Sequence, residues 1–146
     1  AITVGNPGKE VVIDKAIGRH PIHRQRMKIV KEGGRRALSL VDTIRFDGKL
    51  SLVRIRIATG RTHQIRVHLQ DRHTPVYGDD VYGLRDWNSK LAQTHQIQRP
   101  LLHAYQLQLH HPVSNETLTF RAPMDGPMQK IAKIIYPEVE LPDAFS

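Results

Sequence analysis

The side chains best suited to chemistry lie in residues 58–69, where polar groups crowd a short stretch. They are Arg61, Thr62, His63, Gln64 and Arg66. A guanidinium group stays charged and presents a planar fork of donors that fits a carboxylate or a phosphate. The stretch can therefore hold a carboxylate in place or contact a polyanion. The alternative is a turn that carries ordinary solvated arginines.

A strand, a turn and a helix are expected to position these side chains. Apolar residues alternate with arginines just before the stretch, which is the period of a half-buried strand. Gly60 allows a tight exit from that strand, and Thr59 and Thr62 are candidate N-caps of the following helix. Ile65 and Leu69 lie four residues apart, so they are expected to share the buried face of the helix.

Length and composition fit one basic domain. The chain has 146 residues, with 22 Lys+Arg against 14 Asp+Glu and a net charge of +8. This excess favours a polyanionic partner, although a basic protein without such a partner has the same composition. The absence of cysteine excludes disulfides and suits an intracellular protein, with the compartment left open. No apolar run has transmembrane length and the first residues lack a signal-peptide pattern, so no membrane partner is expected.

Other chemistries find little support in the sequence. The nine histidines include no His-x-x-x-His pair, and His63 and His68 are five residues apart, on different faces of a helix. No metal site is therefore expected. The glycine patterns of nucleotide-binding loops are absent, so no cofactor is expected either. Ser39, Ser51 and Ser89 lack the context of a nucleophile elbow.

The rest of the chain reads mainly as strands with a few short helices. Residues 1–10 are expected to form an irregular arm, 11–13 a buried strand fragment, and 137–146 an irregular tail. Strands are expected at 37–46, 50–57, 101–109 and 117–120, and helices after Gly60, within 84–98 and at 127–136.

Three details of this pattern can be tested directly. Leu38, Leu40 and Ile44 are expected on one side of their strand. Asp47-Gly48 is a strong turn signal between the two central strands. The apolar stripe of the last helix is expected to be Met128, Ile131, Ala132 and Ile135.

Four segments together resemble the RluA-type RNA pseudouridine synthases. They are Thr-Gly-Arg-Thr-His-Gln-Ile-Arg-Val-His-Leu at 59–69, Pro-Val-Tyr-Gly-Asp at 75–79 with Tyr82-Gly83, Asp-Lys-Ala-Ile-Gly-Arg-His-Pro at 14–21, and Arg-Pro-Leu-Leu-His-Ala at 99–104. Their order and approximate spacing also resemble the family. The resemblance implies an α+β fold with a mainly antiparallel sheet and short helices, as in the C-terminal portion of the catalytic core.

The resemblance further implies isomerisation of uridine to pseudouridine in rRNA or tRNA, without cofactor or metal. The family's nucleophile is an aspartate in a His-Arg-Leu-Asp-like motif, and no aspartate here has those neighbours. The family's base-stacking tyrosine precedes the glycine-arginine segment, whereas no tyrosine here precedes Tyr77. Residues 1–146 are therefore expected to be a partial catalytic domain, inactive alone, that pairs with a missing N-terminal half or a second copy. A non-catalytic basic RNA-binding fragment is the alternative.

The resemblance assigns roles to individual residues. Arg66 matches the arginine that pairs with the catalytic aspartate, here expected from outside this chain. Leu101 and Leu102 match positions that support the active site from below. Asp79 and Asp80 are interpreted as structural acids that bond backbone in their turn. The candidates for RNA contact are Arg19, His20, Arg61, Thr62, His63 and Gln64.

Overall fold

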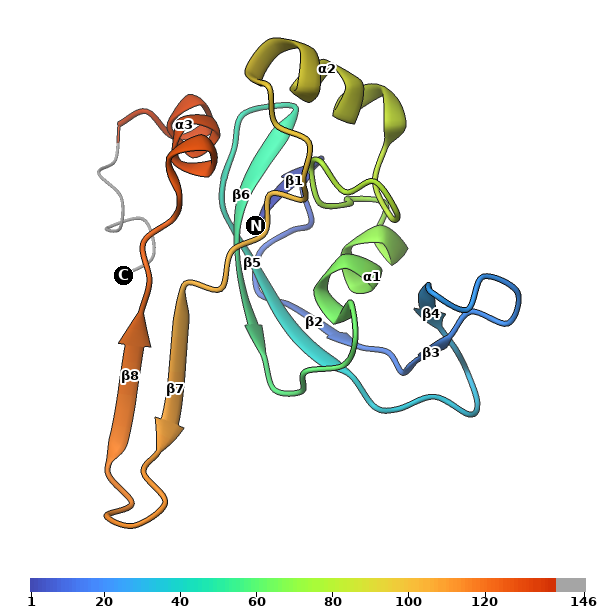
Figure 1. Ribbon diagram of the computed structural model, residues 1–146, viewed down its shortest axis with the longest axis vertical. Helices are drawn as coiled ribbons and strands as arrows, with labels where there is room; N and C mark the ends of the chain where they lie inside the picture. The colour runs from blue at the N-terminus through green and yellow to red at the C-terminus, as the bar shows by residue number, and fades with distance from the viewer. Residues whose placement is uncertain (139–146) are drawn as a thin grey trace.

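The computed structural model describes residues 1–138, which form an α+β fold (Figure 1). Strands β1, β6, β5 and β2 make an antiparallel sheet in that order, and β3–β4 and β7–β8 are separate antiparallel hairpins. The elements are β1 Ile2–Val4, β2 Val11–Asp14, β3 Ile17–Arg19, β4 Met27–Ile29, β5 Leu38–Phe46, β6 Leu50–Ile57, α1 Gln64–Asp71, α2 Arg85–His95, β7 Gln106–His110, β8 Thr117–Arg121 and α3 Gly126–Ile135. The predicted fold class is confirmed.

The hairpin of β5 and β6 is the centre of the sheet and forms where the turn signal predicted it. The Asp47 carboxylate accepts hydrogen bonds from the backbone N–H groups of Lys49 and Leu50 at 2.9 and 2.8 Å. Gly48 has a φ of 101°, which favours glycine. The turn therefore fixes the register that delivers β6 to the polar stretch after residue 57.

The face of β5 that carries Leu38, Leu40 and Ile44 is the less buried of its two faces. Ser39, Val41 and Thr43 are buried, whereas Leu40 is 39% exposed. Ser39 can lie inside because it belongs to a buried hydrogen-bond network described below, whereas the buried Thr43 hydroxyl has no hydrogen-bond partner within residues 1–138. Since successive strand side chains point to opposite faces, Leu38 and Leu40 lie on the face opposite Ser39 and Val41.

The chain start also differs from the prediction. Residues 2–4 of the expected irregular arm form β1, which pairs with β6 through Ile2 and Leu52. The residues that suggested an irregular arm, Gly5, Pro7 and Gly8, follow this strand in the sequence. The fragment at 11–13 is a strand at the sheet edge, where Ile13 is buried but Val12 is 63% exposed. Residues 139–146 of the predicted tail lie outside the described residues.

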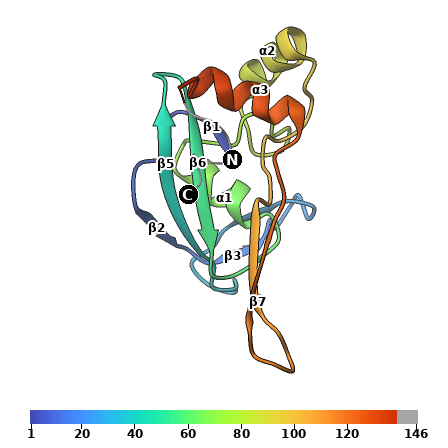
Figure 2. The same cartoon turned by 90° about the vertical axis from the view of Figure 1, so that its left-hand side faces the viewer.

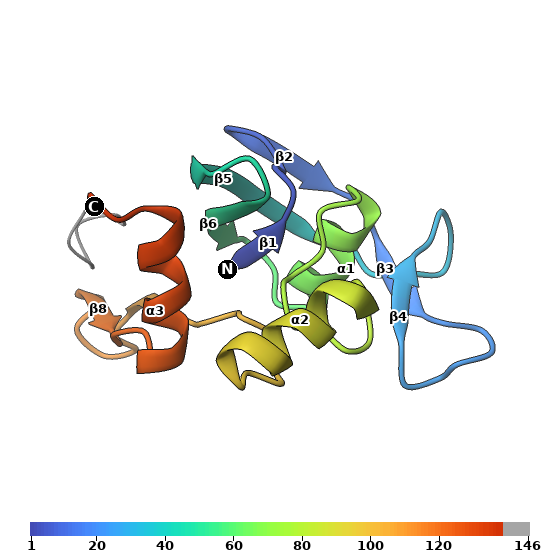
Figure 3. The same cartoon turned by 90° about the horizontal axis from the view of Figure 1, so that it is seen from above.

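Two apolar clusters hold helices against opposite faces of the sheet. Leu69 of α1 packs with Val41 and Val53, while the predicted stripe of α3 packs around Leu52. Neighbouring residues of β6 thus face opposite helices, as strand alternation requires. Seen from above, β6 lies between α3 and α1 (Figure 3). The last helix and its buried stripe, Met128, Ile131, Ala132 and Ile135, are confirmed.

The β7–β8 hairpin projects from the body of the molecule (Figures 1 and 2). Its first strand is shorter than predicted because residues 101–105 are irregular, whereas β8 covers the predicted residues 117–120 and Arg121. Leu107 pairs with Phe120, and the two side chains are 58% and 55% exposed. Within residues 1–138 its strands pair only with each other. The hairpin therefore carries an apolar face that this part of the chain leaves uncovered.

Across residues 1–138, none of the helices has the length and apolar character needed to cross a bilayer.

Truncation of Leu69 tests the packing of α1 on the sheet. Leu69→Ala should lower the free energy of unfolding by about 2–5 kcal/mol, because Leu69 is fully buried and its removal leaves a cavity. Urea unfolding measures this change. Gln70→Ala, at the next and exposed position of the same helix, should change it by less than about 0.5 kcal/mol. Equal effects of the two changes would contradict this packing.

Candidate active site and RNA-contact surface

Arg66 forms a bidentate ion pair with Asp79. Its Nε donates to Oδ2 at 2.6 Å and its Nη2 to Oδ1 at 2.8 Å. The side chain of Asp79 is fully buried, and that of Arg66 is 17% exposed. The ring of Tyr82 lies 5.0 Å from the guanidinium carbon, within range of a cation–π interaction. Arg66 thus has a carboxylate partner inside the chain, which the sequence-based expectation of an external aspartate did not include.

Asp79 also holds its own loop together, as predicted for a structural acid. Its Oδ1 accepts hydrogen bonds from the backbone N–H groups of Val81 and Tyr82, each at 3.0 Å. Burial acts to raise the pKa of Asp79, but the donors from Arg66, Tyr82 and Val81 outweigh it and leave the pKa below its ordinary value. A charged carboxylate therefore fixes Arg66, while Asp80 is exposed.

His63 lies next to this ion pair at the start of α1. Its Nδ1 is 2.7 Å from the hydroxyl of Tyr82, and the two rings meet edge to face at 5.4 Å. Burial and the charge of Arg66 lower the pKa of His63, against the opposite effect of Asp79. His63 is therefore a neutral, partly exposed imidazole at neutral pH.

The predicted N-caps of α1 are wrong. The N-cap residue is His63, in the left-handed conformation with φ 56°, and it makes no side-chain capping bond. Thr62 is exposed in the turn before it. Thr59 instead accepts from the N–H of Leu38 at 2.9 Å, which ties the turn to β5. The turn is therefore held by bonds to the sheet rather than by a local cap.

Gln64 organises this turn and does not face solvent. It is 3% exposed, and its Oε1 accepts from the Thr59 hydroxyl and from the N–H of Arg61. Its Nε2 donates to the carbonyl of Leu38 and to Oγ of Ser39, both at 2.9 Å. All its polar positions are occupied inside the protein. This burial contradicts the expectation that Gln64 contacts RNA.

The other candidates for RNA contact lie on exposed turns. The Nε of Arg61 donates to the carbonyl of Arg36 at 2.9 Å, so its position is partly fixed. Arg19 is exposed at the end of β3, where its Nη1 donates to the carbonyl of Arg24 at 2.7 Å. His20 follows it in the loop between β3 and β4, with Nδ1 accepting two backbone N–H groups of that loop.

A third apolar cluster brings the β3–β4 hairpin to α1. Ile17 of β3 is buried with Val67 of α1 and Tyr82, and Met27 of β4 packs against them. The hairpin lies on the far side of α1 from the projecting β7–β8 hairpin (Figures 1 and 3). Arg19 and His20, which are distant in sequence from Arg66, are therefore carried by an element that packs on the helix of Arg66.

The two leucines predicted to support the site lie in different clusters. Leu101 is fully buried and exchanges backbone hydrogen bonds with Ile2 and Tyr77. Leu102 is partly buried against the cluster of Leu69, on the α1 side of the sheet. Leu102 is thus the leucine on the same side of the sheet as Arg66, and Leu101 belongs to the core beside α3.

A buried polar network joins α1 to β5 below the turn. The Ser39 hydroxyl accepts from Gln64 and donates to Nδ1 of His68 at 2.8 Å, since Nε2 of His68 donates to the carbonyl of Lys15 at 2.9 Å. His68 is fully buried, and burial lowers its pKa. Every donor meets an acceptor when His68 is neutral, so the network explains the buried Ser39 and favours a neutral His68.

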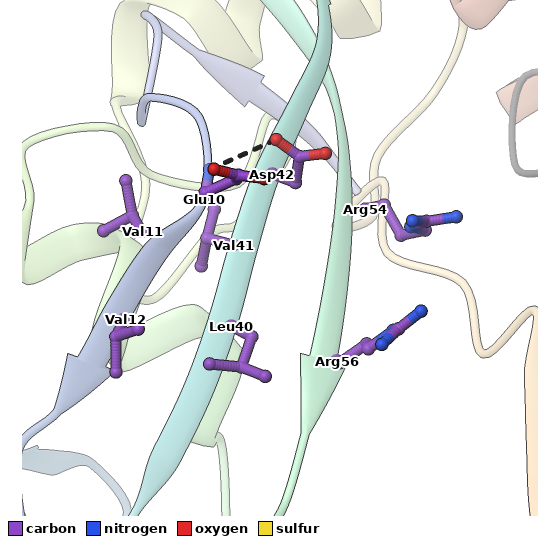
Figure 4. A pocket seen from close by; sticks show the side chains of 8 residues that line it. All are labelled: Glu10, Val11, Val12, Leu40, Val41, Asp42, Arg54 and Arg56. Atoms are coloured by element: carbon purple, nitrogen blue, oxygen red, sulfur yellow. Dashed lines mark hydrogen bonds between the residues drawn. The ribbon is translucent and has the colours of Figure 1, made fainter.

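Two other features lie apart from the candidate site. No group of three or more His, Cys, Asp or Glu able to hold a metal occurs in residues 1–138. A groove of about 330 Å³ lies on the sheet surface (Figure 4), and its lining residues are Glu10, Val11, Val12, Leu40, Val41, Asp42, Arg54 and Arg56. Leu40 and Arg56 face away from α1, so this groove is separate from Arg66.

Comparison with known proteins supports one family. The sequence profile described as RNA pseudouridylate synthase matches residues 1–71. The chain is 38% identical over 136 residues to ribosomal large subunit pseudouridine synthase D of Nitrosomonas europaea, which covers 92% of the chain and 39% of that protein. It is 39% identical over 135 residues to an uncharacterised RNA pseudouridine synthase of Chloroflexus aurantiacus. That alignment covers 91% of this chain and 40% of the relative.

The fold agrees with these sequence matches. The structure of human RNA pseudouridylate synthase domain containing 1 superposes with a TM-score of 0.68 at 28% identity, over 85% of this chain and 52% of that one. The chain thus belongs to the RNA pseudouridine synthase family, as its motifs predicted. It spans about two fifths of the length of the curated relatives it matches.

Sequence reasoning missed two residues of this site. Asp79 was interpreted as a turn residue, but it is also the buried partner of Arg66. Tyr82 received no role, although it is 3% exposed and its hydroxyl makes two hydrogen bonds. Both residues could have been found from the sequence, because Gly78-Asp79 and Tyr82-Gly83 belong to the segment at 75–83 that resembles the family.

Replacing Arg66 by lysine tests the ion pair. Arg66→Lys keeps the charge but loses the fork, so it should lower the free energy of unfolding by about 2–3 kcal/mol, the range of hydrogen bonds to charged groups. Urea unfolding provides the measurement. The control is Arg36→Lys, in an ion pair with Asp14 whose side chains are 73% and 50% exposed. Its effect should stay below about 0.5 kcal/mol.

The His68 network makes stability depend on pH. Because the folded state lowers the pKa of His68, its contribution is complete above the unfolded pKa of about 6.5 and is lost as the pH falls below it. The urea midpoint should therefore drop between about pH 7.5 and 5.5. His68→Gln should be less stable at neutral pH and show a smaller drop, whereas the exposed His73→Gln should behave as wild type. A wild-type midpoint that rises on acidification would contradict the neutral network.

Proposed function

We propose that the protein containing this chain isomerises uridine to pseudouridine in ribosomal RNA. The isomerisation breaks the bond from ribose to uracil N1, turns the base and rejoins it through carbon 5, so it requires no oxidant or energy source. Membership of the family supports the reaction, and the synthase D relatives support a large-subunit RNA substrate. The observation that carries the proposal is the fixed, partly exposed guanidinium of Arg66 within the motif shared with the family.

In this proposal Arg66 orients the catalytic aspartate and also holds the loop that carries Asp79. Asp79 occupies Nε and Nη2, which leaves Nη1 for a second carboxylate. Two carboxylates around one guanidinium would hold the arginine rigid and keep the nucleophile ionised. The nucleophile itself would come from outside these 146 residues, since no aspartate here has the family's neighbours.

Two surfaces of this fold could bind an additional segment of the parent protein. β1 pairs with residues 50–52 of β6, which leaves residues 54–57 without a strand on that side within residues 1–138. The apolar face of β7–β8 is uncovered in the same part of the chain. Exposed edges and apolar faces of this kind favour association. We therefore propose that an N-terminal segment with the catalytic motif packs here, with a second copy as the alternative occupant.

RNA contacts would surround Arg66. The proposed contact surface consists of cationic and neutral polar side chains around the start of α1 and on the β3–β4 hairpin. Its members are the exposed Arg19 and Thr62 and the partly exposed His20, Arg61 and His63. Cationic side chains of this kind bind phosphates, with an affinity that falls as salt rises. The target base must leave its stack, which is easiest in loops and single strands of RNA.

Pseudouridine formation in large-subunit RNA tests the function. The 146-residue chain should be inactive, and activity should return when the N-terminal half of the parent protein is added. In the complete protein Arg66→Lys should lose activity by about 100-fold or more, because a misplaced catalytic group carries a cost of that order. Asp79→Asn disturbs the same ion pair and should lose less, since Arg66 remains.

The controls separate the possible failures. Variants are compared at a temperature where circular dichroism shows each to be folded. Activity of the 146 residues alone would mean that one of their own carboxylates is the nucleophile. RNA binding without activity in the complete protein would favour a non-catalytic RNA-binding module, which the charge of +8 also fits.

A further inference from the structure

Tyr82 joins three segments through one hydroxyl group. The N–H of Met27, at the start of β4, donates to this oxygen at 2.8 Å, and Nδ1 of His63 lies 2.7 Å from it. Tyr82 itself follows Asp79 in the loop after α1, and its ring lies against the guanidinium of Arg66. The β3–β4 hairpin, the start of α1 and the Arg66–Asp79 pair thus meet at one buried side chain.

The donors and acceptors around this hydroxyl favour one placement of the protons. A backbone N–H can only donate, so the Tyr82 oxygen accepts from Met27. Among the described residues Nδ1 of His63 is the acceptor within reach of the hydroxyl proton, so the arrangement that leaves no buried hydroxyl proton unpaired has Nδ1 accepting. A neutral His63 carries its own proton on Nε2 in this arrangement. The hydroxyl therefore favours one tautomer of the imidazole.

His63 is held in an uncommon conformation with an available donor. Its φ of 56° and ψ of 22° lie in the left-handed region, which few residues other than glycine adopt. Such conformations persist when the surroundings enforce them, often at functional sites. Within residues 1–138 the Nε2 atom of His63 has no hydrogen-bond partner, and the side chain is partly exposed three residues before Arg66.

We propose that Tyr82 is a positioning residue of the RNA-contact surface. Its hydroxyl holds the β3–β4 hairpin against α1 and presents Nε2–H of His63 to an acceptor oxygen of RNA beside Arg66. This inference rests on the proposed function for the RNA, but the geometry it requires can be measured without RNA. Loss of the hydroxyl should release His63 and the hairpin together while the ring remains beneath Arg66.

Tyr82→Phe removes only the hydroxyl group and is compared with Tyr77→Phe, a buried tyrosine in the same segment that contacts Trp87. Nitrogen-15 NMR should show the Nε2–H tautomer of His63 in wild type and Tyr77→Phe, and a mixture of tautomers in Tyr82→Phe. Amide exchange of Met27 should accelerate in Tyr82→Phe alone. Affinity for a uridine-containing RNA stem–loop should fall about 5-fold in that variant, the equivalent of one hydrogen bond.

The outcomes separate this inference from the proposed function. A wild-type His63 protonated on Nδ1, or a tautomer unchanged in Tyr82→Phe, overturns the positioning role. A changed tautomer with unchanged RNA affinity also overturns it, because the contact would then be structural only. Absence of RNA binding by the wild-type protein overturns the proposed function instead, and the NMR comparison still decides whether Tyr82 holds His63 and the hairpin.

Discussion

The bidentate ion pair of Arg66 and Asp79 is the constraint on which the rest of the site depends. A buried carboxylate is tolerated here because the guanidinium and two backbone N–H groups surround it. The same bonds fix the loop that carries Tyr82 and the helix that carries Arg66. The placement of the Tyr82 loop against the first turns of α1 is therefore set by one charge pair, and a change to either partner affects both segments.

In the proposed function Arg66 binds two carboxylates at once, that of Asp79 and that of the nucleophile, and a lysine cannot do both. A compact ammonium can neutralise one carboxylate, whereas a planar guanidinium can serve two from different sides. The proposed function gives Arg66 a role toward the catalytic aspartate. In this structure its buried partner, Asp79, already fixes two of its three nitrogens. Asp79 thus fixes the Arg66 side chain without any contribution from the proposed nucleophile.

The sequence predicted those features that depend on local patterns. The Asp47 turn, the hairpin of β5 and β6 and the stripe of α3 follow from spacing within about ten residues, and all are confirmed. The inward face of β5 was not predictable in this way, because Ser39 lies inside only through bonds to Gln64 and His68, which are distant in sequence. The motif singled out both Arg66, which is partly exposed beside Asp79, and Gln64, which is buried. A shared string identifies residues that matter without saying whether they face the substrate or the core.

The pairing of β1 with β6 has a consequence for the order in which the chain folds during synthesis. Ile2 pairs with Leu52, so the ribosome releases β1 about fifty residues before its partner strand exists. The β5–β6 hairpin can form locally, but β1 must wait, with Ile2 and Val4 exposed until β6 is complete. Closure of the sheet at this edge is therefore a late event in folding. β1 is the strand in which a chaperone would find apolar residues of this chain that are not yet covered.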